Sequence, residues 1–421
     1  MKLLAVGDLH LGRRPPRLPE DLQPRASELG PAGAWRRLVE AAIREEVHAV
    51  VFAGDLVERE DDFFEAYDEL YGGVRRLREA RIEVLAVAGN HDVRVLPRLA
   101  REIPGFRLLG EGGVWEVAEL KAAGERLAVW GWSFPERRFS RSPLPKKGFD
   151  LRPGLNLGLL HCDRDQSGGT YAPVSTGELA GAGLDGWLLG HIHKPDPLSS
   201  ASPSGYLGSV AGLDPGEPSA HGPWLYTIER GEIAIVEQWV LAPLRWQPVE
   251  IDLTGIAEVE DARQRLVHRV RLLDGEIRSS SWKPEAVGLR VELQGRTMLG
   301  RAVRKLLSEE APELTSGLTA HYFVESTRAL TLPEVPLDLL EMRADPAGLL
   351  ARRLCLLDRP ESDPERLRLL ESARRRLEAR AGSDPYSKAE TDELTDAAVA
   401  DYLRRAASDL LERMLASEEK A

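Results

Sequence analysis

Short polar clusters that directly follow runs of apolar residues constrain this chain more than any other feature. The apolar runs Leu3–Gly7, His48–Phe52 and Ile82–Ala88 have the length and composition of buried strands, and segments with helical spacing separate them. This alternation predicts parallel strands joined by right-handed crossovers, and hence an α/β fold. Because ligands bind beyond the carboxyl ends of strands in open α/β sheets, we expect the polar clusters to meet in one place.

These clusters consist of residue types that bind divalent metals. In chain order they are Asp8-Leu9-His10, Gly54-Asp55, Gly89-Asn90-His91-Asp92, His161 and Gly190-His191-Ile192-His193. Histidine, carboxylate and amide ligands together suit two Mn²⁺ or similar borderline ions better than a thiolate zinc site. A lone carboxylate such as Asp55 is suited to bridge the two ions. Two such ions can hold a bridging hydroxide for in-line attack on phosphorus, so the pattern predicts a phosphoesterase.

The series of clusters resembles the motifs of the calcineurin-like metallophosphoesterase superfamily, which read D-x-H, G-D, G-N-H-[DE], H and G-H-x-H. This resemblance implies one metal held by Asp8, His10, Asp55 and His193, and a second held by Asp55, Asn90, His161 and His191. It also implies that His91 is the general acid that protonates the leaving oxygen. Asp92 would either orient His91 or cap the adjoining turn.

Within the superfamily, the chain is most similar to the SbcD-type DNA repair nucleases and their YhaO-like bacterial branch. The similarity lies in the first motif close to residue 1, in the string Gly190–Pro195, and in Tyr206–Ser209 followed by Leu213–Glu217. It implies a Mn²⁺-dependent DNA exonuclease or endonuclease that works with an SMC-like coiled-coil ATPase subunit similar to SbcC. The alternatives are a phosphodiesterase or phosphatase for small esters on the same fold, and a docking scaffold for the ATPase.

The chain is expected to have three parts. Residues 1–245 are predicted to form the metallophosphoesterase (nuclease) domain, a four-layer α/β/β/α sandwich. Residues 250–330 are predicted to form a small α/β cap domain, and residues 338–421 a helical region that docks a partner. The Pro-punctuated stretch Leu332–Pro336 is interpreted as a linker, and helix starts are indicated by Asp345-Pro346, Asp363-Pro364 and Ser383-Asp384-Pro385.

The last predicted helix carries an apolar stripe that consists of Leu403, Ala407, Leu410, Leu411 and Met414. This stripe would pack on the neighbouring helix, Leu367–Leu377, as a plain hairpin, or would dock on the coiled-coil base of the ATPase. The two arrangements are compatible if one side of the hairpin faces inward and the other side faces the partner.

The formal net charge of −12 argues against an autonomous nucleic-acid binder, because phosphate contacts need Lys and Arg. Local basic loops remain candidates for contact with a DNA backbone: Arg13 and Arg14 after the first motif, and Arg137 and Arg138 further on. Solvated loops explain the same residues equally well. The chain has two cysteines and no apolar run of membrane-spanning length, so we expect a cytoplasmic protein, and the sequence leaves room for a homodimer.

Overall fold

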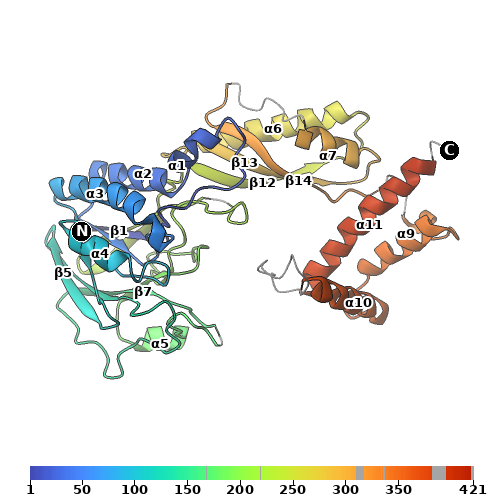
Figure 1. The fold of residues 1–421 in the computed structure, drawn as a ribbon. Coiled ribbons are helices and arrows are strands. Elements are labelled where there is room, and N and C mark those ends of the chain that lie inside the picture. The colour runs from blue at the N-terminus through green and yellow to red at the C-terminus, as the bar shows by residue number, and fades with distance from the viewer. Residues whose placement is uncertain are drawn as a thin grey trace. The chain divides into compact units, whose positions relative to one another are not determined.

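The computed structural model describes residues 1–166, 168–218, 220–309, 317–332, 334, 337–381 and 395–418. The chain divides into two compact units (Figure 1). The N-terminal unit comprises residues 1–247, 274–288 and 317–323, and the C-terminal unit comprises residues 248–273, 289–316 and 324–421. The division into three domains at 1–245, 250–330 and 338–421 stays a prediction.

The first sheet of the N-terminal unit has six strands in the order β11-β10-β1-β2-β3-β4. The strands are β1 (Lys2–Val6), β2 (Ala49–Phe52), β3 (Glu83–Ala86), β4 (Phe106–Leu108), β10 (Trp224–Glu229) and β11 (Glu232–Gln238). β1, β2 and β3 run parallel, as the sequence predicts. β4 adds a further parallel strand, and β10 pairs antiparallel with β1. Three helices pack on one face of this sheet through a buried apolar core, namely α2 (Pro31–Arg44), α3 (Phe63–Glu79) and α4 (Leu96–Glu102).

The second sheet has five strands in the order β5-β6-β7-β8-β9. They are β5 (Glu116–Ala122), β6 (Glu125–Trp132), β7 (Leu155–His161), β8 (Gly186–Gly190) and β9 (Gly205–Tyr206). Apolar residues of both sheets share one core, and a separate core that includes Trp187 and Leu179 covers the other face beneath α5 (Thr176–Gly181). Two sheets packed face to face between helices form the predicted four-layer α/β/β/α sandwich.

A third sheet, in the order β12-β13-β14, contains residues of both units. Its strands are β12 (Leu244–Asp252), β13 (Ala286–Gln294) and β14 (His321–Ala329). The sequence gives no strand pattern over β12, which contains Pro248. Proline cannot donate a ladder hydrogen bond, and it is tolerated here because β12 lies at the edge of the sheet.

The remaining elements are short helical turns near the start of the chain and the helices of its C-terminal part. They are η1 (Gln23–Arg25), α1 (Ala26–Leu29), η2 (Glu60–Asp62), α6 (Val259–Arg278), α7 (Gly300–Glu309), α8 (Leu337–Leu340), α9 (Pro346–Leu357), α10 (Pro364–Ala381) and α11 (Asp396–Glu418). Among the residues described, no helix combines the length and the apolar character that crossing a membrane requires.

Two of the three predicted helix starts are confirmed. The carboxylate of Asp345 accepts the backbone N–H of Gly348 at 2.8 Å at the start of α9. Asp363 accepts the N–H groups of Glu365 and Arg366 at 2.8 and 3.0 Å at the start of α10. The third start, Ser383-Asp384-Pro385, and part of the expected linker Leu332–Pro336 lie outside the described residues.

The apolar stripe of α11 packs mainly within its own unit. Leu411 is fully buried against Ala351 and Leu354 of α9, and Ala407 and Met414 pack on the same cluster. Leu403 joins a second cluster with Leu370 of α10. Leu410 departs from the prediction, since its side chain is 44% exposed. Of the stripe, Leu403 packs on α10 as the hairpin interpretation predicts, whereas Ala407, Leu411 and Met414 pack in the cluster of α9 instead.

Candidate metal centre

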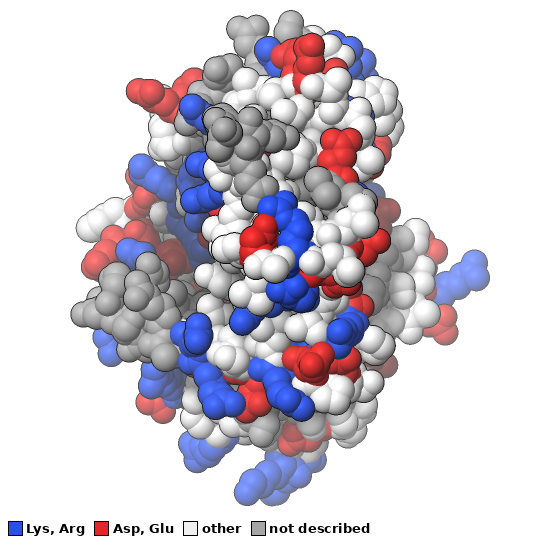
Figure 2. Space-filling view, turned by 90° about the vertical axis from the view of Figure 1, so that its right-hand side faces the viewer, with Lys and Arg blue, Asp and Glu red and all other residues white. Residues whose placement is uncertain are grey.

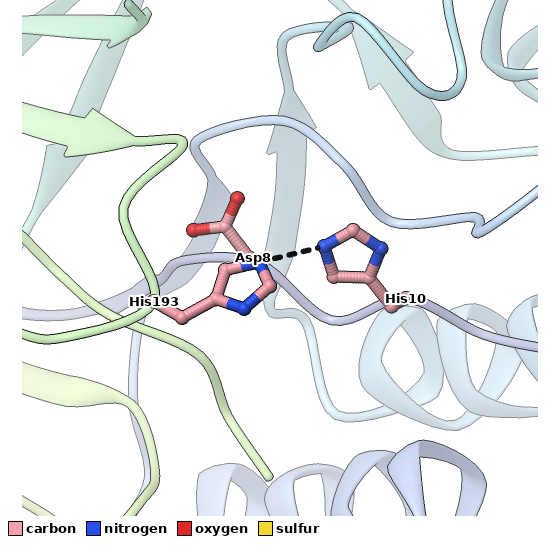
Figure 3. Close-up of side chains that lie close together, drawn as sticks. All are labelled: Asp8, His10 and His193. Carbon is pink, nitrogen blue, oxygen red and sulfur yellow. Dashed lines mark hydrogen bonds between the residues drawn. The ribbon is translucent and has the colours of Figure 1, made fainter. Parts of the chain in front are cut away.

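Side chains from the first and last predicted clusters converge. The ligand atoms of Asp8, His10 and His193 all lie within 4.8 Å of one another. Figure 3 shows the three side chains, with Asp8 and His10 on the loop after β1 and His193 on the loop after β8. The Nε2 atoms of the two histidines approach to 3.2 Å. Because β1 and β8 belong to different sheets, this group joins the carboxyl ends of both.

A second group of ligand atoms consists of Asp55, His161 and His191, again within 4.8 Å of one another. The Nε2 atom of His161 lies 3.3 Å from Oδ2 of Asp55 and 3.0 Å from Oδ1 of Asn90. Asp8 connects the two groups, because its carboxylate accepts the backbone N–H of His191 at 3.0 Å. The structure thus brings together every residue for which the sequence predicts a role as a metal ligand.

The donor set of these groups fits divalent metals. Imidazole nitrogens and carboxylate and amide oxygens converge on two small volumes, which matches the ligands of Mn²⁺ and related ions. Burial alone lowers the pKa of His161, but the charge of Asp55 and a hydrogen bond to its carboxylate raise that pKa to about 9. A metal that binds His161 must displace this proton, so its affinity rises with pH.

The backbone at the site is conformationally demanding. His10, Asp55 and His191 have φ values of 53°, 49° and 106°, in the left-handed region that L-residues avoid. Gly54 and Gly89 permit the close approach, because a Cβ at these positions would lie 2.6 Å from Nδ1 of His161 and 2.1 Å from Oδ1 of Asp55. The ligands are therefore placed by strained turns and by glycines that no larger residue can replace.

Three carboxylates that the sequence analysis did not single out contact the site histidines. Glu58 lies 2.7 Å from Nδ1 of His10, Asp163 lies 2.9 Å from Nε2 of His191, and Glu217 lies 2.7 Å from Nδ1 of His193. A carboxylate on one ring nitrogen fixes the ring and leaves the other nitrogen for a metal. The contacts of Glu58 and Glu217 turn the Nε2 atoms of His10 and His193 toward each other.

Glu217 also explains the strings Tyr206–Ser209 and Leu213–Glu217. Its carboxylate accepts the hydroxyl of Ser209 at 3.3 Å and the N–H of Leu213 at 3.0 Å. The backbone N–H of Ser209 donates to the carbonyl oxygen of His193 at 2.9 Å. This segment therefore acts as a structural support for His193, and its polar groups are already engaged within the chain.

The structure distinguishes between the two roles considered for Asp92. Its buried carboxylate accepts the N–H groups of Leu56 and Gly89 at 2.6 and 2.8 Å. Burial and the charge of Asp55 together raise the pKa of Asp92 to about 7. Asp92 thus ties the loop after β2 to the loop after β3, which corresponds to the capping role.

His91 lies beside the first group of ligands and is half-buried. Its Nδ1 atom is 3.1 Å from the carbonyl oxygen of Glu58, and its ring centre is 5.1 Å from that of His10. Its backbone N–H donates to Oδ1 of Asp55 at 3.0 Å. Because the carbonyl oxygen holds a proton on Nδ1, Nε2 is the nitrogen free to exchange a proton with a substrate.

Basic residues accompany the site. The Nη1 atom of Arg13 lies 3.9 Å from Glu58, and the arginine side chain is 32% exposed. Arg14, Arg137 and Arg138 are exposed on their loops. Figure 2 shows a face on which Lys and Arg side chains gather in clusters between Asp and Glu side chains, so the negative net charge is compatible with local basic patches. The binding of nucleic acid by these four arginines stays a prediction.

Comparison with known proteins agrees with this geometry. Residues 1–195 match the family model described as calcineurin-like phosphoesterase. This segment of the chain contains every expected metal ligand and His91. Over residues 1–195 the chain is thus similar to the calcineurin-like metallophosphoesterase superfamily. That superfamily consists of phosphoester hydrolases that use divalent metals.

The chain is 29% identical over 241 residues to the uncharacterized metallophosphoesterase YhaO of Bacillus subtilis. The aligned segment covers 56% of this chain and 59% of YhaO. It is 28% identical over 289 residues to the DNA double-strand break repair protein Mre11 of Aeropyrum pernix, and the alignment covers 64% of this chain and 68% of that protein. It is 31% identical over 202 residues to the DNA double-strand break repair protein Mre11 of Sulfolobus acidocaldarius, and the alignment covers 46% of this chain and 50% of that protein. The similarity to YhaO therefore spans less than two thirds of that protein.

Proposed function

We propose that this chain is the nuclease subunit of a DNA repair complex, a cytoplasmic phosphodiesterase that depends on two divalent metals, most readily Mn²⁺. The observation that carries the proposal is the convergence of two ligand groups at the strand ends, with His91 beside them. Similarity to two DNA double-strand break repair proteins supports DNA as the substrate. The half-buried Arg13 beside Glu58, and the exposed Arg14, Arg137 and Arg138 on their loops, supply cations for a phosphate backbone.

Each residue of the site has a role in this proposal. Asp8, His10, Asp55 and His193 would hold one metal, and Asp55, Asn90, His161 and His191 the other. When bound, the two metals would activate water and neutralise charge on the phosphoryl oxygens. Glu58, Asp163 and Glu217 hold the histidine rings in place. His91 donates the proton of Nε2 to the leaving oxygen, while the Glu58 carbonyl oxygen holds its Nδ1–H.

A phosphodiesterase or phosphatase for small esters is the rival on the same fold. The two are separated by measuring cleavage of single-stranded, blunt and hairpin DNA with Mn²⁺, beside a chromogenic phosphodiester. We expect DNA cleavage that disappears with a chelator and returns with Mn²⁺. Hydrolysis of the chromogenic ester without any cleavage of DNA would overturn the nuclease proposal, and metal binding without hydrolysis of either substrate would favour a docking scaffold.

We also propose that the helices after residue 337 dock an SMC-like coiled-coil ATPase. The support is a set of exposed large apolar side chains on α8 to α11 and the turn that follows α8, which consists of Leu339, Met342, Leu349, Leu367, Tyr402 and Leu410. Large apolar side chains exposed in this number are typical of protein-binding surfaces. An amphipathic partner helix can cover them in the way that helix-in-groove interfaces do.

The docking proposal predicts the effect of a truncation. A chain that ends at Glu334 should still cleave small phosphodiesters, because the expected ligands all precede residue 194. It should no longer co-purify with an ATPase encoded alongside it. Pull-down of the tagged full-length and truncated chains measures the difference. Loss of small-ester cleavage on truncation, or retention of the ATPase, would contradict the docking role.

A further inference from the structure

The C-terminal unit contains a cavity of about 340 Å³ between α7, β14 and α11. Arginine side chains line it from all three elements: Arg301 and Arg304 from α7, Arg328 from β14 and Arg405 from α11. Two acidic residues, Asp409 and Glu412, also line it. The guanidinium groups therefore outnumber the carboxylates in a space large enough for a small molecule, since ligand pockets begin at about 300 Å³.

The carboxylates of the cavity are already engaged. Asp409 forms an ion pair with Arg413, one turn further along α11. Glu412 is buried, and its carboxylate accepts the backbone N–H of Arg301 at 2.8 Å, in the first turn of α7. Burial raises the pKa of Glu412 above its usual value. The acidic residues thus leave much of the positive charge of the arginines uncompensated.

The arginines have few partners of their own. In the ranges that the structure describes, no carboxylate oxygen lies within 4 Å of the guanidinium groups of Arg301, Arg304 or Arg328. Arg405 pairs with Asp401 on its own helix. Burial and the charge of Arg328 lower the pKa of Arg405, so these guanidinium groups repel one another. An anion placed among them would relieve this repulsion.

Two buried polar atoms in the cavity wall also lack a partner. Within the described residues, neither Oγ1 of Thr327 nor Nε of Arg405 has a hydrogen-bond partner. Buried polar atoms are almost always hydrogen-bonded, so these two atoms are available to a group that enters the cavity. A hydroxyl and a guanidinium N–H in the lining of one cavity are suitable donors to the oxygens of a phosphate.

We propose that this cavity binds the phosphate groups of a nucleotide, either a free nucleoside diphosphate or the phosphorylated end of a DNA strand. Planar guanidinium groups bind phosphate oxygens through paired hydrogen bonds, which a cluster of arginines can provide from several sides. The ring of Tyr402, 55% exposed and part of the cavity lining, offers a face on which a base can stack. The site uses none of the expected metal ligands, so it does not rest on the proposed nuclease function.

The test measures binding of radiolabelled ADP and of a short 5′-phosphorylated oligonucleotide to the full chain by equilibrium dialysis. Arg304→Ser combined with Arg328→Ser should weaken binding of one of these probes at least tenfold. Arg368→Ser combined with Arg375→Ser removes the same charge from exposed positions on α10 and should change neither. The probe that responds identifies the source of the phosphate, and an oligonucleotide without the 5′ phosphate should lose the effect.

Two further measurements locate the site and guard against misfolding. Photolabelling with 8-azido-ADP should modify a peptide that contains Tyr402. The single change Arg328→Lys, on a strand where the side chain is exposed, should retain part of the binding if charge and not fold is responsible. Equal binding of both probes to the wild type and to the Arg304/Arg328 variant would overturn the proposal, as would photolabel found only on peptides of the metal centre.

Discussion

The metal centre and the arginine cavity are both clusters of charged side chains, but the chain assembles them differently. Every expected metal ligand lies within four residues of a strand end, so neighbouring strands place the ligands side by side. The cavity is lined by two helices and a strand that are far apart in the sequence, with Arg301 and Glu412 separated by 111 positions. Sites at strand ends are therefore recognisable from sequence, whereas sites between helices depend on packing that no local pattern indicates.

The largest effect is expected from Asp55→Ala, which tests whether the centre is one cooperative unit. Asp55 faces His161 and His191 and also supports the backbone of His91. Its loss should remove both metals and the activity together. The decrease should exceed the roughly 10–100-fold change caused by losing an orienting partner. Elemental analysis and phosphodiester cleavage measure the two losses, and retention of both metals would show that Asp55 does not bridge them.

A smaller and more selective effect is expected from His91→Ala. We expect kcat to fall by about 10²–10⁴-fold, since a positioned general acid contributes that much, while metal content stays unchanged. A substrate with a good leaving group, such as a nitrophenyl ester, should be affected less because its leaving oxygen needs no proton. Metal content and kcat for esters of graded leaving groups are the measurements. Loss of a metal would instead place His91 among the ligands.

Changes to the carboxylates that orient the histidines should have a smaller effect than His91→Ala. Glu217→Gln removes the charge that lies against Nδ1 of His193 and should weaken metal affinity by about 10–100-fold. Asp214→Asn changes an exposed carboxylate in the same segment and serves as the matched control. Titration with Mn²⁺ by calorimetry measures both affinities. If the two variants bind Mn²⁺ equally, Glu217 supports the fold of its segment but does not tune the centre.

The smallest effect is expected at Asp274, a buried carboxylate outside both sites. It accepts the N–H of Thr319 at 2.7 Å and the hydroxyl of Tyr322 at 3.2 Å. Burial opposes the charge of Asp274, but these hydrogen bonds and Arg278 lower its pKa overall. Asp274→Asn should lower the free energy of unfolding by about 1–3 kcal/mol at pH 7 without changing activity.

The pH dependence of this variant provides a check on the cause. Because the folded pKa lies below the unfolded value of 3.8, the stabilisation is present above about pH 4 and is lost as pH falls through the folded pKa. The difference between the wild type and Asp274→Asn should therefore shrink in acid. Urea unfolding at a series of pH values measures it, and a difference that is constant with pH would assign the effect to packing.

A residue's role could be predicted from the sequence where the pattern that indicates it lies within a few neighbouring residues. The ligands and the helix starts at Asp345 and Asp363 depend on the nearest few residues, and the structure places them as expected. Strand β12 was missed because Pro248 suppresses the strand pattern without preventing an edge strand. Glu58, Asp163 and Glu217 carry no periodicity, and only folding shows that they reach histidines.

The left-handed backbone of His10, Asp55 and His191 has a consequence for protein engineering. Each such residue stores about 1–3 kcal/mol of conformational strain. A redesign that optimised thermal stability alone would favour glycine at these three positions, because glycine adopts this geometry without a steric penalty. The same replacements would delete a carboxylate and two imidazoles from the centre. At these three positions stability and activity therefore conflict, and stabilising changes should be sought away from the metal centre.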